Sequence, residues 1–332
     1  MRAKALLERM ERECESRPEV TPNAKTYTCV ICAMAKSRRQ TDALEANRIL
    51  ERMWSRYQDG DNSAKPDAVA FTAVISCWSS INQQHGRDYG ADEVVLELLE
   101  RMKTLAEQGH EDMAPNARTY TSVLKTLSNS QKSYAYDKAM WLLDEMETSF
   151  QEGNLAVEPS NFHYNAILDL IARGSFLDKV GPATELFREM KALGRESVRP
   201  NIITYNSLLR VCANTYGGSE EKQEALKLAI ELFRKVLRDD SMEASSITFL
   251  FFFKCVRKHG RVDPQFQLKV FQHSFDYCCK RGLLSDYILA QLKMALTADV
   301  LKGLLGLESI PNELSVSDLP SEWSRNGSIG DR

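Results

Sequence analysis

The sequence lacks any long hydrophobic run, and this absence excludes a membrane-spanning helix. Such a helix needs about 20 consecutive apolar residues, whereas the most apolar stretch, residues 247–256, is short and is followed by Arg257 and Lys258. The N-terminal residues also lack the apolar core of a secretory signal, and they are too acidic for an organelle transit peptide. Without a secretory signal, the eight scattered cysteines indicate reduced thiols and not a disulfide framework.

A surplus of basic residues is also missing. The chain has 43 Lys and Arg against 46 Asp and Glu, and its formal net charge is −3. Proteins that bind nucleic acid through charge alone usually carry a clear positive surplus. If RNA is the ligand, its affinity must therefore come from a localised positive groove and from contacts with the bases.

Catalytic and metal-binding patterns are likewise absent from the sequence. The five histidines are dispersed, and no nucleophile with a neighbouring base can be proposed. Cys29 and Cys32 have the spacing of a redox or metal-binding pair, but no second pair lies nearby, so we expect both to serve structural packing. We predict that the protein is not an enzyme and that it holds no cofactor and no metal.

One motif recurs along the chain: a proline, a short polar residue, three variable residues and an aromatic residue. Its five complete copies begin at Pro22, Pro66, Pro115, Pro159 and Pro200, at spacings of 44, 49, 44 and 41 residues, and a sixth copy at residues 244–249 lacks the proline. A proline disfavours helix in the residue before it, and the polar residue after it can cap a new helix. Each copy therefore predicts the start of a helix.

A second motif alternates with the first. Leu-Leu-Glu-Arg-Met, or a close variant of it, ends at Met10, Met53, Met102, Met146, Met190 and Val236. Apolar residues in both motifs recur at three- and four-residue steps, which is the period of an amphipathic helix. Glycines such as Gly60 and Gly109 follow as expected helix stops. We predict that the methionine column packs in the core.

Two-helix units of this kind cannot bury their apolar faces alone, so they stack on their neighbours. The predicted fold is all-α: an α-solenoid, a right-handed superhelix of stacked helix-turn-helix repeats. We predict a partial repeat with only its second helix at 1–23, then repeats at 24–67, 68–116, 117–160, 161–201 and 202–245. A degenerate repeat follows at 246–282, then a capping helix at 283–306 and a polar tail at 307–332. If this tail docks, we expect it to dock through Trp323. Because arrays usually begin with a whole unit, the lone first helix favours a fragment of a longer array over an N-terminal cap.

These motifs resemble those of the pentatricopeptide repeat family. The resemblance rests on the Thr-Tyr-Asn or Thr-Tyr-Thr start of the first helix, the Leu-Phe-x-Glu-Met core of the second and the closing Pro-Asp or Pro-Asn, and it covers about residues 2–282. Units of the family have about 35 residues, whereas these have 41 to 49. We place the surplus in polar loops such as 60–65, 82–89 and 217–221, because loops tolerate insertions at a small entropic cost.

The resemblance implies binding of single-stranded RNA, one base per unit, through two or three side chains. It assigns base reading to the residue after the first-helix aromatic and to the residue after the proline that closes the unit. The pairs are Thr28 with Asp67, Thr72 with Asn116, Thr121 with Ser160, Asn165 with Asn201, and Asn206 with Ser245. By the family's preferences they select G, A, a purine, C and a pyrimidine, from 5′ to 3′. Leu250 holds this position in the sixth unit and cannot hydrogen-bond a base, so that unit should be silent.

The resemblance also implies that the residue two positions before the aromatic wedges between neighbouring bases. These base-sandwiching residues are Lys25, Val69, Arg118, Phe162 and Ile203. The three apolar ones suit the role, whereas the lysine and the arginine depart from it, although either could reach a phosphate. A plainer alternative stays open for the closing residues, because Asp67, Asn116 and Asn201 would cap helices in any helical solenoid.

The implied role is the processing, stability, editing or translation of an RNA in a mitochondrion or chloroplast, with protein partners for RNA processing. The alternative is a protein-binding helical-repeat scaffold of the tetratricopeptide kind, which the acidic balance favours, although the usual Trp and Gly-Tyr landmarks of that family are absent. The residues after the first-helix aromatics separate the two possibilities. They would line a polar and basic groove in an RNA binder, but apolar pockets in a peptide binder.

Overall fold

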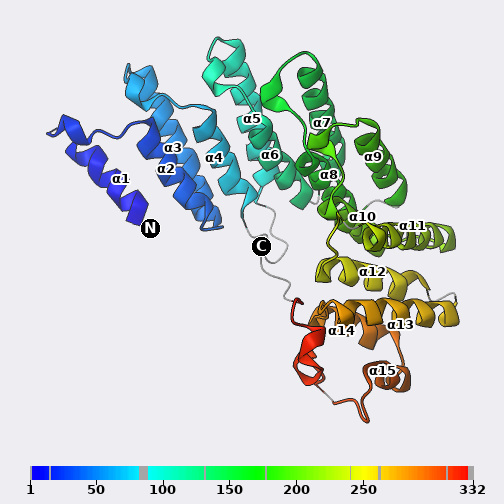
Figure 1. The fold of residues 1–332 in the computed structure, drawn as a ribbon. Coiled ribbons are helices and arrows are strands. Elements are labelled where there is room, and N and C mark those ends of the chain that lie inside the picture. The colour runs from blue at the N-terminus through cyan, green and yellow to red at the C-terminus, as the bar shows by residue number, and fades with distance from the viewer. Residues whose placement is uncertain are drawn as a thin grey trace. The chain divides into compact units, whose positions relative to one another are not determined.

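The computed structural model describes residues 2–14, 16–81, 89–130, 132–175, 178–239, 241–260, 263–311 and 313–327. These residues form helices α1 to α15, and none of them lies in a strand, which confirms the all-α prediction (Figure 1). None of the described helices is long and apolar enough to cross a bilayer. The chain divides into two compact units, Met1–Leu170 and Ile171–Arg332, and the division falls inside α8 (Asn161–Arg173).

The first unit is built from stacked helix pairs. After α1 (Arg2–Glu13) come α2 (Ala24–Ala35) with α3 (Gln40–Gln58), α4 (Ala68–Ser79) with α5 (Ala91–Glu107), α6 (Ala117–Asn129) with α7 (Ala135–Gln151), and most of α8. Helices α2 and α4 each pack on their own second helix and on the first helix of the next pair, and α6 packs on α7. The first helices α2, α4 and α6 therefore form one continuous layer.

The second unit repeats this arrangement. It contains α9 (Val180–Ala192), α10 (Ile202–Asn214) with α11 (Ser219–Arg238), α12 (Ser246–His259) with α13 (Pro264–Lys280), and then α14 (Asp286–Ala295) and α15 (Ala298–Leu305). Helices α10, α12 and α14 form the layer, and α11 and α13 pack against it. Consecutive stacking of helix pairs is the arrangement of an α-solenoid, as predicted.

The first helices begin directly after the polar residue that follows each proline. Oδ1 of Asp67 accepts a hydrogen bond from the backbone N–H of Ala70 at 2.8 Å. Asn116 and Asn201 each accept from the backbone N–H groups two and three positions on. Loss of such a cap costs about 1 kcal/mol. These three closing residues are therefore helix caps, whatever further role they have.

The turns between units are more regular than the sequence suggested. Helices α3, α5, α7 and α9 are each followed by a glycine with a left-handed backbone, with φ of +98° at Gly60 and +95° at Gly109. A 3-10 turn then buries one apolar residue ahead of the next proline, and Met113 in such a turn is 0% exposed. The turn recurs four times, so residues 60–65 are a regular part of the repeat and not an insertion. Of the predicted insertion at 82–89, residues 82–88 lie outside the described residues.

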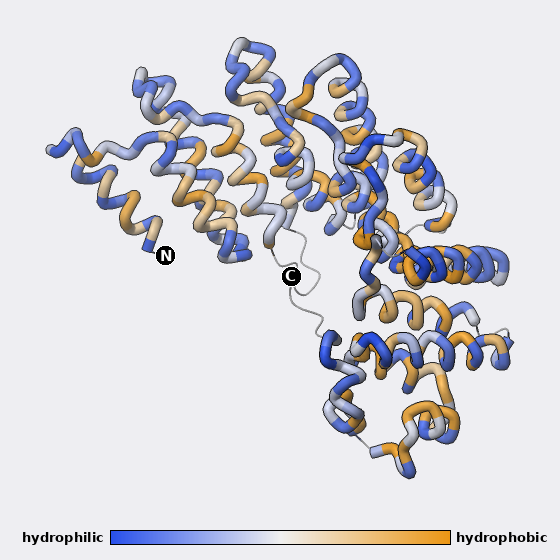
Figure 2. Tube along the Cα trace, in the orientation of Figure 1, coloured by the Kyte–Doolittle hydropathy of each residue, from blue (hydrophilic) through white to orange (hydrophobic). Residues whose placement is uncertain are grey.

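The first-helix aromatics and the methionine column form the core. Tyr27 and Phe71 are 0% exposed, and the methionines of the column are buried except Met10 in α1. Figure 2 shows the resulting hydrophobic bands along the helices. Replacing Phe71 by alanine would cost about 3–5 kcal/mol of stability, because the cavity adds to the lost burial. The predicted core role is confirmed for Met53, Met102, Met146 and Met190, but not for Met10.

The C-terminal segment differs from the prediction of one capping helix and a polar tail. The helix is divided into α14 and α15, because the backbone is extended at Leu296 and Thr297. The tail folds back, and the Trp323 ring packs edge-on against Phe275 with centroids 5.5 Å apart. The backbone N–H of Leu284 donates to the Trp323 carbonyl at 2.8 Å. Trp323 is thus the docking residue, as expected, but it belongs to an ordered segment.

Candidate nucleic-acid interface

Five of the ten residues predicted to read bases, those that follow the first-helix aromatics, occupy equivalent places on five first helices. They are Thr28 in α2, Thr72 in α4, Thr121 in α6, Asn165 in α8 and Asn206 in α10. Each directly follows a buried aromatic residue, and so lies beside the core-facing stripe of its helix. The base-sandwiching residue stands three positions earlier in every case, which places both on the same helix face, one turn apart.

The base-sandwiching positions are open to solvent. Phe162 is 62% exposed, Val69 57% and Ile203 49%, although large apolar side chains usually avoid such exposure. Lys25 and Arg118 are exposed as well. The structure adds Ile247 in α12, which is 38% exposed and which we did not name from the sequence. Its place two residues before the buried Phe249 was the signal that could have found it.

Hydrogen bonds join three of the reading residues to the next first helix. Thr72 Oγ1 lies 2.7 Å from Oγ1 of Thr119, and Asn206 Oδ1 accepts from Oγ1 of Thr248 at 2.8 Å. Thr121 Oγ1 lies 3.0 Å from Nε2 of His163. Thr119, Thr248 and His163 all directly precede the aromatic of their own helix. Sequence reasoning missed these contacts, because they join residues more than 40 positions apart.

His163 makes a small buried network. Its Nδ1 accepts from the backbone N–H of Ser160 at 2.9 Å, and its Nε2 donates to the carbonyl of Ala117 at 2.8 Å. Thr121 Oγ1 donates to the same carbonyl at 2.9 Å. Burial lowers the pKa of His163 and outweighs the hydrogen bonds to Ala117 and Ser160, which raise it. The ring is therefore neutral at neutral pH and fixes the hydroxyl of Thr121.

Asn165 has a different environment from the other reading residues. It is 6% exposed, and neither its Oδ1 nor its Nδ2 has a hydrogen-bond partner among the described residues. A buried amide left unsatisfied costs about 1–3 kcal/mol per group. An unsatisfied donor and acceptor at a predicted reading position is what a site for a hydrogen-bonding ligand would provide.

A group of cations, here called the Lys179 cluster, gathers in the second unit. It consists of Lys179, Arg210, Lys254, Arg257 and Lys258. Lys258 Nζ lies 4.6 Å from the ring centroid of Tyr216, and Lys179 Nζ lies 5.3 Å from it. Burial lowers the pKa values of Lys179, Lys254 and Lys258, and the neighbouring cations lower them further. The cluster therefore favours a bound anion, despite the acidic balance of the whole chain.

Two members of the cluster are in register with the reading positions. Arg210 stands four residues after Asn206 on α10, and Lys254 stands four residues after Leu250 on α12. In the first unit, the exposed Lys125 stands four residues after Thr121 on α6. Residues four apart lie on the same helix face. Helices α6, α10 and α12 therefore each carry an exposed side chain, a reading position and a cation along one face. We call the row of exposed side chains and reading positions on the first helices, with these cations, the stripe.

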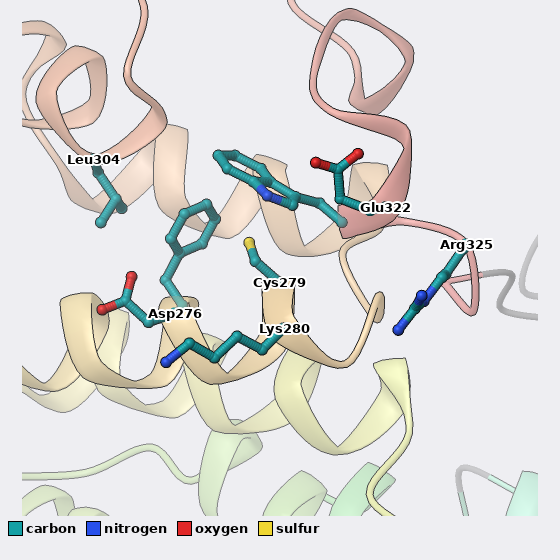
Figure 3. Close-up of a pocket in the computed structure, with 8 residues that line it drawn as sticks. Asp276, Cys279, Lys280, Leu304, Glu322 and Arg325 are labelled. Atoms are coloured by element: carbon teal, nitrogen blue, oxygen red, sulfur yellow. The ribbon is translucent and has the colours of Figure 1, made fainter.

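Other groups of reactive side chains do not suggest catalysis. A cavity of about 500 Å³ lies between α13, α15 and the docked tail, with Cys279 in its wall (Figure 3). Burial raises the pKa of the Cys279 thiol to about 12, so it stays protonated and is a poor nucleophile. Cys29 and Cys32 are exposed, so our prediction that they serve structural packing was wrong. Within the described residues, no group of three or more His, Cys, Asp and Glu side chains could hold a metal ion.

The fold and this stripe define a class of protein: an α-solenoid of helical repeats with polar positions in register along its first helices. Residues 154–215 match the family model of the pentatricopeptide repeat domain, which confirms the resemblance for this segment. The segment contains α8, α9 and α10, and with them Asn165 and Asn206. Proteins of this family generally bind RNA. No curated protein matches the chain.

Proposed function

We propose that the protein binds single-stranded RNA in a sequence-dependent manner through the stripe on its first helices. One observation carries this proposal: an exposed side chain and a reading position lie one turn apart on each first helix, and a cation follows one turn later on α6, α10 and α12. Bases need a surface for stacking and a partner for their hydrogen-bonding edges, and the backbone needs a cation. The match of residues 154–215 to the pentatricopeptide repeat domain supports the proposal.

The exposed first-turn side chains supply the stacking surface. Phe162 offers an aromatic face, and Val69, Ile203 and Ile247 offer smaller apolar ones. Stacking on an aromatic side chain contributes about 1–3 kcal/mol per base. Lys25 and Arg118 stand at the same position in their helices and would contact the sugar-phosphate backbone or, for the arginine, stack on a base.

The reading residues supply the hydrogen bonds. Because Oδ1 of Asn206 accepts from Thr248, its Nδ2 group is oriented to donate to a base. An amide donor suits the O2 acceptor that both pyrimidines carry, and a pyrimidine is the class of base that the Asn206–Ser245 pair predicts. Among the closing residues, capping occupies Oδ1 of Asn116 and of Asn201. Their Nδ2 groups can still donate to a ligand.

The target we propose has the core G-A-purine-C-pyrimidine and belongs to an organellar transcript. The protein would act on this RNA without catalysis, by occupying it or by recruiting partners for processing, stabilisation, editing or translation. Occupation alone can block a nuclease or expose a neighbouring segment, so that no reactive group is needed. The mitochondrion or chloroplast is the compartment that the family resemblance favours.

The proposal is tested by fluorescence anisotropy of the whole chain with a labelled single-stranded RNA and with the duplex of the same sequence. The single strand should bind more tightly, with an affinity that falls with salt. Arg210→Glu with Lys254→Glu should reduce the slope of log Kd against log salt by about 1.4, because a single strand contributes about 0.7 per phosphate contact. The matched control is Lys222→Glu with Lys227→Glu, the same charge change on the exposed face of α11. Equal loss in both double variants would contradict a localised site.

A further inference from the structure

An open pocket of about 560 Å³ lies between the second helices α11 and α13, apart from the reading residues. Phe252 of α12 and Phe233 of α11 belong to its lining, and their rings stack in parallel with centroids 3.8 Å apart. Phe266 of α13 also lines the pocket and is 39% exposed. The lining residues of α13 run from Phe266 to Tyr277, which is about 16 Å of helix at 1.5 Å per residue. We call it the α11–α13 pocket.

The charges of this pocket all have one sign. Arg234 and Arg238 on α11 and Lys269 on α13 line it, and all three are exposed. No Asp or Glu is among the described residues that line it. An apolar floor flanked by three cations, with no carboxylate among the described lining residues, is therefore present in a chain whose net charge is −3. Such a surface is complementary to a partner that is apolar on one face and acidic beside it.

We propose that the α11–α13 pocket docks an acidic amphipathic helix of a protein partner. A helix of about three turns matches the 16 Å of α13 that line the pocket. Its apolar residues at three- and four-residue steps would lie on Phe233, Phe252 and Phe266, as in other complexes that seat a helix in a groove. Its carboxylates would pair with Arg234, Arg238 and Lys269. This docking does not depend on RNA binding, because none of these residues belongs to the reading stripe.

The test uses the whole chain and a designed fluorescein-labelled peptide of 14 residues, with leucines at three- and four-residue steps and glutamates at most other positions. A second peptide carries lysine in place of every glutamate. The glutamate peptide should bind with micromolar affinity, and the lysine peptide should bind at least about tenfold more weakly. Arg234→Glu with Arg238→Glu should weaken the glutamate peptide about tenfold or more, and Phe266→Ala severalfold. Lys222→Glu with Lys227→Glu on the exposed face of α11 should leave it unchanged.

Several results would overturn the proposal. One is the absence of peptide binding at millimolar concentration, and another is equal binding of the two peptides. A third is a variant with Arg234→Glu and Arg238→Glu that loses RNA binding but keeps peptide binding. That result would assign the pocket to RNA. A fourth is a result from sedimentation: the unchanged chain self-associates and this variant does not. The occupant of the pocket would then be a second copy of the chain. Circular dichroism of each variant shows whether the helices are retained.

Discussion

Replacing Phe162 by alanine should weaken RNA binding while changing stability little. The side chain is 62% exposed on the first turn of α8, so only about a third of a full phenylalanine burial is lost, or about 1 kcal/mol. A base stacked on an aromatic side chain contributes about 1–3 kcal/mol. The expected increase in Kd is therefore about 5- to 150-fold.

The assay is fluorescence anisotropy with the predicted RNA at constant salt, with urea unfolding of the same sample. Leu155→Ala is the matched control, because Leu155 is an apolar side chain that is 75% exposed in a turn outside the first helices. Phe162→Ile should retain part of the affinity, as isoleucine holds the equivalent place in α10 and α12. The reasoning is refuted if Phe162→Ala binds within twofold of the unchanged chain, or if Leu155→Ala loses as much.

Two further predictions concern stability. Lowering the pH below about 6.5 should destabilise the protein. Burial lowers the pKa values of His163 and His259 in the folded chain, so these two histidines become protonated at a higher pH in the unfolded chain than in the folded one. His163→Thr, which introduces the residue found at this position in four of the other repeats, should reduce this pH dependence in urea titrations, and an unchanged dependence would refute the role of His163. Trp323→Ala should lower the free energy of unfolding by about 3 kcal/mol and increase proteolysis of the tail, because the contact of the Trp323 ring with Phe275 is lost. A tail that resists proteolysis as well as before would count against docking through this ring.

The helix starts could be predicted because their signals are local. A cap such as Asp67 bonds a backbone amide three residues later, so sequence spacing alone determines the geometry. The same holds for the apolar period that places Tyr27 and Phe71 in the core. The exposed base-sandwiching positions follow from the register of those aromatics, and Ile247 could have been added by the same rule.

Contacts between repeats could not be predicted in this way. The hydrogen bond between Thr72 and Thr119 depends on how two first helices pack, and the sequence does not encode that distance locally. The Lys179 cluster likewise gathers cations from α10, α12 and the turn before α9. The docked tail was missed because its polar composition conceals the few buried residues, such as Leu314 and Leu319, that hold it. The exposure of Cys29 and Cys32 was missed because their helix is apolar on more than one face.

The central claim is that the chain reads RNA sequence through its first helices. It is tested most directly by comparing the affinity for a single strand with the core G-A-purine-C-pyrimidine to that for a scrambled strand of the same composition. The predicted core should bind more tightly, and Asn165→Ala with Asn206→Ala should remove most of that preference, at about 1–3 kcal/mol for each lost hydrogen-bonding group. Equal affinity for the core and the scrambled strand, or a preference that survives both substitutions, would contradict the claim.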